Sequence, residues 1–139
     1  MRTKLSLVVA GSALLLATVP VTAHHAFSAE FEADKPVTLK GTVTEVEWIN
    51  PHTWIHIDVK GPDGKVTNWM IEGGPPNALL RRGFTKNSLP AGVEIVVQGY
   101  LTKDGTERAN GRDLTFADGK KLFIGSAGTG APGDPAGQK

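Results

Sequence analysis

The chain has 139 residues, with 15 lysines and arginines against 14 aspartates and glutamates, and no cysteine. That length fits one small domain, and the lack of cysteine excludes disulfides, thiolate nucleophiles and cysteine-based zinc sites. The nearly neutral charge, without a basic stripe, argues against a nucleic-acid partner.

The first 23 residues have the pattern of an export signal. A basic start at residues 1–4 precedes an apolar run over residues 5–20, which is too short to hold the chain in a bilayer, and Val-Thr-Ala at 21–23 supplies the small residues that a signal peptidase needs. We expect residues 1–23 to be a signal peptide that is cut after Ala23. The product would be periplasmic or secreted, with no membrane anchor.

Residues 24–36 are expected to form an N-terminal arm. Pro36 and four nearby charged residues argue against a long helix, while Phe27 and Phe31 can pin the arm to the body. If fully extended, residues 26–36 span at most about 36 Å, which is enough to cross a small domain.

The rest of the chain alternates in the manner of β-strands. We expect strands at residues 37–49, 52–60, 65–72, 93–101, 111–116 and 120–124, with a hairpin turn at 61–64. The apolar positions of the first strand change parity near Thr44 and Glu45, which predicts a bulge or bend there. In the second strand, Thr53, Ile55 and Ile57 share one face.

One short helix interrupts the strands. The sequence Pro-Pro-Asn-Ala-Leu-Leu-Arg-Arg at 75–82 predicts about two helical turns that end at Gly83. A helix between the third and fourth strands is the arrangement of the OB-fold, a small Greek-key barrel. We therefore expect an all-β, OB-fold-like domain over residues 37–124, with a β-sandwich as the alternative, followed by a disordered Gly/Pro-rich tail at 125–139.

The histidines are the candidate metal ligands. Cleavage after Ala23 would leave His24 with a free α-amine beside its imidazole, a pair of donors that suits copper. His25, His52 and His56 are the other imidazoles. His52 is the preferred partner, because His52 and His56 lie about 13 Å apart along a strand and cannot share one ion. The alternatives are a solvated arm that binds no metal, or an arm that contacts a partner protein.

A second candidate surface is the outer face of the second strand. Trp54 lies there with His52 and His56, next to the loop that contains Asn50. In OB-folds this face and the adjoining loops bind extended ligands. Three further polar residues are expected beside it, and together they would hold an acidic or sugar ligand; they are Arg108, Asn110 and Arg112. The alternative for each arginine is a solvated rim position.

No pattern of a hydrolase is present. The chain lacks a Gly-x-Ser-x-Gly elbow, a His-Glu-x-x-His motif and a cysteine. We therefore expect no catalytic residues, and a redox enzyme that uses bound copper is the remaining enzymatic alternative.

Several segments together resemble a family of exported bacterial proteins classed only as a domain of unknown function. They are residues 24–31 (HHAFSAEF), 40–43 (KGTV), 48–52 (WINPH), 72–83 (EGGPPNALLRRG), 110–112 (NGR) and 118–123 (DGKKLF). The resemblance implies that the histidine pair belongs to the family pattern. It implies no activity.

The residues favour an exported periplasmic binding module. In the first version of this hypothesis, the module holds copper through His24, its α-amine and His52. In the second, it is a metal-free accessory protein that docks a protein partner or a glycan on the face of the second strand.

Overall fold

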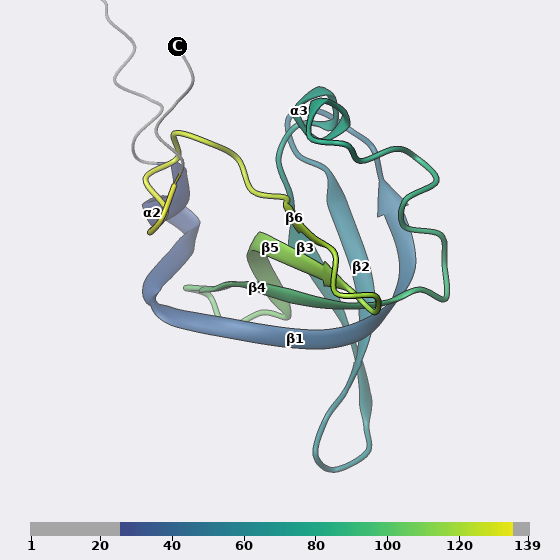
Figure 1. Ribbon diagram of the computed structural model, residues 1–139. Helices are drawn as coiled ribbons and strands as arrows, with labels where there is room; N and C mark the ends of the chain where they lie inside the picture. Colours follow the sequence, from purple (N-terminus) through teal and green to yellow (C-terminus); the bar gives the residue numbers. More distant parts are fainter. Residues whose placement is uncertain (1–25, 135–139) are drawn as a thin grey trace, which may run out of the picture.

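A computed structural model describes residues 26–134 of the chain (Figure 1). Its elements are α2 (Ala26–Glu30), β1 (Phe31–Glu47), β2 (Trp54–Lys60), β3 (Val66–Glu72), α3 (Pro76–Arg81), β4 (Glu94–Thr102), β5 (Arg108–Phe116) and β6 (Lys121–Phe123). No helix in this part of the chain is long and apolar enough to cross a membrane.

The strands form one ring-like sheet. Their order is β3-β2-β1-β4-β5-β6, and β3 also pairs in parallel with β5, so that five strands close on themselves while β6 extends β5. The long β1 pairs with β2 near its end and with β4 over its first part, and it curves along one side of the molecule (Figure 1). This order confirms the predicted all-β class with an OB-fold-like arrangement.

Helix α3 lies where the sequence predicts it, between β3 and β4, at one end of the ring (Figure 1). Proline at its start costs no backbone hydrogen bond, because the first N–H groups of a helix have no partner within it. Leu79 points into the core and is almost fully buried, while Leu80 stays exposed. The helix therefore covers one end of the core.

The bend in β1 is also confirmed. The pairing of β1 with β2 shifts register between Val43 and Glu45, as the change of parity predicts. Gly41 lies just before this point, and a Cβ there would approach the backbone oxygen of Asp58 to 2.7 Å. The close contact between β1 and β2 at this point requires glycine.

The core fills the inside of the ring. The alternating face of β2 provides Ile55 and Ile57, and other strands provide Ile71, Ile95 and Leu114, all at most 1% exposed. Trp48 and Trp69 are partly buried against this core. The period-two pattern of the sequence therefore identified the inward face correctly.

The expected arm differs from the structure. Residues 26–30 form α2, and β1 begins at Phe31 rather than at Val37, so residues 31–36 belong to a strand of the sheet rather than to a separate arm. The Phe27 ring stacks on Phe31 at 5.7 Å between centroids and meets Tyr100 edge-on at 5.4 Å. These aromatic contacts hold the segment against the body, as expected of Phe27 and Phe31, and Phe31 and Pro36 also pair with β4.

The start of the expected tail is packed as well. Ala131 is buried with Phe27 and Phe31, and the carboxylate of Asp134 pairs with the Arg112 guanidinium. Residues 125–134, called the C-terminal segment below, therefore lie against the body, and this corrects the expectation of an unanchored tail. Residues 135–139 lie outside the described residues.

Candidate functional site

A polar cluster lies where β3 meets both of its neighbours. Trp54 of β2 is in register with Glu72 of β3, and Glu72 is in register with Asn110 of β5. His52, Arg108 and Glu30 adjoin this row through contacts described below. We call these residues the strand-2 cluster: Glu30, His52, Trp54, Glu72, Arg108 and Asn110.

Glu72 is the buried centre of the cluster, with 8% of its surface exposed. The Asn110 amide nitrogen donates a hydrogen bond to Oε1 at 3.4 Å, and His52 Nδ1 lies 3.7 Å from the same oxygen. Burial raises the pKa of Glu72, because the charged carboxylate loses its hydration, although the charge of His52 opposes this. The Oδ1 atom of Asn110 is buried and has no hydrogen-bond partner in the part of the chain that the structure describes.

His52 is held by the backbone of the loop between β3 and α3. Its Nδ1 lies 3.3 Å from the carbonyl oxygen of Gly73. Because a carbonyl oxygen only accepts hydrogen bonds, this contact requires the proton on Nδ1, and in the neutral form of the ring the lone pair is then on Nε2. Nε2 makes no hydrogen bond with any described residue, and the side chain is 34% exposed.

Arg108 forms the outer layer of the cluster. Its guanidinium carbon lies 5.1 Å from the centre of the Trp54 ring, and its Nη2 donates to a carboxylate oxygen of Glu30 at 3.2 Å. Glu30 belongs to α2, so the N-terminal helix helps to orient Arg108. The neighbouring surface is hollowed by about 470 Å³, and it is lined by Ala29, Glu30, Thr102, Lys103, Asp104 and Arg108.

Asp104 caps the turn at the edge of this hollow. The hydroxyl and the backbone N–H of Thr106 both donate to Oδ1, at 2.7 and 3.0 Å. These hydrogen bonds lower the pKa of Asp104 to about 2, because they favour the ionised carboxylate. The hollow therefore carries both signs of charge.

The remaining predicted residues lie apart from the cluster. His56 Nε2 is 2.6 Å from Glu47 Oε1, and Asn50 lies exposed in the loop between β1 and β2, with a cis bond to Pro51. Arg112 is buried and binds the C-terminal segment. His24 and His25 lie outside the described residues, and among the described residues no group of three His, Cys, Asp or Glu side chains is placed to hold a metal ion.

The structure thus brings together His52, Trp54, Arg108 and Asn110, and it adds two acidic residues that the sequence patterns missed. Glu72 follows the buried Ile71 and precedes two glycines. The one local signal in the sequence that could have indicated its burial is therefore a charged residue at the end of an apolar strand. Glu30 had none, because its role depends on where α2 lies.

Comparison with known proteins gives a family but no activity. No curated protein matches the chain. A model of a family of unknown function, DUF6152, matches residues 13–111. The matched range ends before Arg112 and before the 118–123 motif that contributed to the resemblance. Because the match covers more than half of the sequence, the chain belongs to the DUF6152 family.

Proposed function

We propose that this chain is an exported binding module that docks a protein partner on the strand-2 cluster without a metal. The observation that carries the proposal is the Arg108 guanidinium over the Trp54 ring, with Glu30 as its ionic partner. The signal-like pattern of residues 1–23 supports export.

Trp54 and Arg108 are the residue types that most often dominate protein interfaces. Both are only partly buried, so each retains surface that a partner can cover. The contact with Glu30 restrains the Arg108 side chain before a partner binds, so less conformational entropy is lost on association. Trp54 belongs to β2 and Arg108 to β5, so both side chains are fixed to strands of the sheet.

The test uses the mature chain as bait on extracts of the cells that produce it. The partner recovered is then purified, and its affinity is measured for the wild type and for Trp54→Ala. We expect Trp54→Ala to weaken binding about 30-fold, the loss typical of a hot-spot residue. Val66→Ala is the matched control, because Val66 is 61% exposed on β3 and lies outside the cluster.

Two results would contradict the docking proposal. One is a partner that binds Trp54→Ala as tightly as the wild type. The other is a glycan that competes fully with the protein partner, which would assign the face to sugar recognition. Circular dichroism of each variant confirms that the sheet is retained.

Copper binding is a second candidate, favoured by the orientation of His52. Histidines that bind metals usually donate their other ring N–H to a carbonyl or carboxylate, and His52 Nδ1 has this arrangement with Gly73. The proposed ligands are Nε2 of His52 with the α-amine and imidazole of His24. The position of α2 argues against copper binding. The Phe27 N–H donates to the Thr129 carbonyl oxygen at 3.4 Å, and this holds α2 against the C-terminal segment. The segment therefore lacks the long reach expected of an extended arm.

Copper titration of the processed chain tests this candidate. Binding should weaken at least tenfold both in His52→Ala and in a chain with one extra alanine before His24. Equal affinity in all three proteins would exclude the site. Mass spectrometry of the natural product, isolated from the cell envelope, tests export independently, and we expect a chain that starts at His24.

A further inference from the structure

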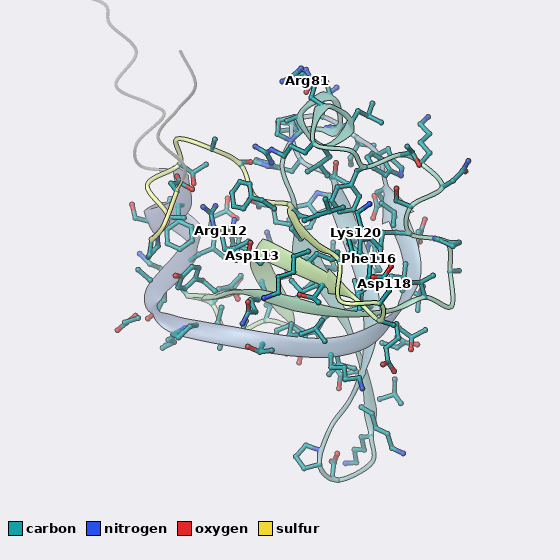
Figure 2. All side chains as sticks on the ribbon, in the orientation of Figure 1. Arg81, Arg112, Asp113, Phe116, Asp118 and Lys120 are labelled. Carbon is teal, nitrogen blue, oxygen red and sulfur yellow. The ribbon has the colours of Figure 1, made fainter. Side chains whose placement is uncertain are left out.

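A second cavity lies on the outer face of the sheet, beneath the C-terminal segment. It has a volume of about 280 Å³, near the lower end of the range for small-molecule sites. Its floor is formed by β1, β4 and β5, and Pro132 and Gly133 lie at its rim. Figure 2 labels Arg112 and Asp113 in this region, between α2 and β6.

Three polar side chains form a row across the floor. Thr38 of β1 is in register with Gln98 of β4, and Gln98 is in register with Asp113 of β5. Residues opposite each other in antiparallel strands point to the same face. All three are exposed and line the cavity, and none of their side chains makes a hydrogen bond or ion pair with a described residue. Their hydrogen-bonding groups are therefore open to a ligand.

The nearby positive charge is already neutralised. Arg112 Nη2 donates to Asp134, and Nη1 donates to the carbonyl oxygen of Ser126 at 3.2 Å. Arg112 also lies over the Phe123 ring, 4.8 Å from its centre, and Arg82 lies over the same ring at the same distance. Among the described residues, the cavity lining thus offers no unpaired cation for an anionic ligand.

The apolar part of the lining comes from Pro36, Val37, Tyr100 and Phe123. A hydroxyl group of a ligand both donates and accepts hydrogen bonds, so it matches a row made of the Gln98 amide, the Thr38 hydroxyl and the Asp113 carboxylate. Hydrogen bonds to the Asp113 carboxylate are the strongest of these. We propose that this cavity is a binding site for a small neutral sugar, distinct from the strand-2 cluster and independent of the function proposed for it.

The test is an NMR titration of the isotope-labelled mature chain with D-glucose, D-galactose and N-acetyl-D-glucosamine, with glycerol and acetate as comparison ligands. We expect at least one sugar to cause saturable shifts in the amide signals of residues 98–100 and 112–113. Asp113→Ala should weaken the binding about tenfold and Gln98→Ala about fivefold. Glu45→Ala, an exposed acidic residue outside the cavity, should leave it unchanged.

Several outcomes would overturn the proposal. These are the absence of saturable shifts with all three sugars, equal binding by the wild type and Asp113→Ala, and acetate or glycerol binding as tightly as the best sugar. Both substituted side chains are exposed, and a preserved amide spectrum in each variant shows that a loss of binding does not come from unfolding.

Discussion

Gly99 lies where β4 and β5 change register, between Gln98 and Gly99 on one strand and Asp113 and Gly111 on the other. A Cβ on Gly99 would lie 1.8 Å from the backbone oxygen of Asn110. Backbone cannot move aside as a flexible side chain can, so this position requires glycine for steric reasons.

Gly99→Ala should therefore lower the free energy of unfolding by at least about 2 kcal/mol, the cost of forcing a group into packed structure. Urea denaturation measures this loss. Gly128→Ala is the control, because it has a positive φ of 72° but open space around it, and it should lose only about 1 kcal/mol. A loss in Gly99→Ala no larger than that in Gly128→Ala would contradict the steric argument.

Glu72 makes stability depend on pH in a defined direction. Burial raises its pKa above the ordinary 4.5, with His52, Asn110, Arg108 and Glu30 as the other groups that act on it. Between 4.5 and the raised pKa, the native state binds more protons than the unfolded state, so this residue lowers the free energy of unfolding as the pH rises.

Glu72→Gln removes this titration while retaining an acceptor for Asn110. We expect the variant to gain stability relative to the wild type as the pH rises through that window, with the largest difference above it. Thermal unfolding at a series of pH values measures the difference. Glu45→Gln, at an exposed position, should run parallel to the wild type, and a parallel curve for Glu72→Gln would refute the argument.

Helix α2 and the C-terminal segment hold each other in place. The Asp134 carboxylate accepts hydrogen bonds from Arg112, from the N–H and hydroxyl of Thr129 and from the N–H of Gly130. Burial raises the pKa of Asp134, but the hydrogen bond and charge of Arg112 outweigh it, and the net shift is downward. The stabilisation is therefore present above pH 3.8 and is lost as the pH falls through the folded pKa.

Asp134→Asn should loosen the C-terminal segment at neutral pH, because buried Arg112 then lacks its ionic partner. Hydrogen exchange at Thr129 and Gly130 should accelerate at least tenfold, while exchange in β2 stays unchanged. Asp118→Asn is the matched control, because it affects only the hydrogen bond from the Lys120 N–H to the Asp118 carboxylate in the β5–β6 turn. Unchanged exchange at Thr129 would mean that Asp134 does not hold the segment.

At the scale of the whole molecule, the parallel pairing of β3 with β5 closes the ring, and we expect the ring to unfold as one cooperative unit. Met70, Ile71 and Glu72 pair with Arg108, Ala109 and Asn110, so the first half of the fold is joined directly to the last part. Single domains of this size usually unfold in one transition. The strand-2 cluster lies on this junction, and its geometry depends on the closed ring.

Ile57→Ala tests this cooperativity. Ile57 is fully buried, and its truncation should cost about 3 kcal/mol, whereas Val66→Ala on the exposed part of β3 should change stability by less than about 0.5 kcal/mol. Tryptophan fluorescence and circular dichroism should report the same urea midpoint in each protein. Separate midpoints for the two probes would show that the ring does not unfold as one unit.

Local patterns predicted the order of the core elements well. The alternation in β2 identified Ile55 and Ile57 as buried, and the parity change in β1 located the bulge. The ends of the domain were predicted less well. Glycines and prolines suggested a disordered tail, and no helix was expected at residues 26–30, whereas Phe27 and Ala131 are buried in one cluster across more than a hundred residues of sequence.

The candidate site followed the same division. Residue type predicted four members of the site, His52, Trp54, Arg108 and Asn110. It did not predict that Arg112 and His56 lie apart from them, each paired with another acidic residue. Arg112 follows Asn110 by two positions, so alternation along a strand predicts both side chains on one face. The Arg112 guanidinium instead pairs with Asp134 of the C-terminal segment.

By itself, the sequence determined what its short-range periodicities encode: the order of the strands, the helix α3, the hairpin turn at 61–64 and the inward face of β2. The tertiary structure alone decided which charges meet, because Glu30, Glu72 and Arg108 lie on three separate elements. Alternation of side chains is a property of one strand, whereas the position of a charge relative to another depends on how the ring closes.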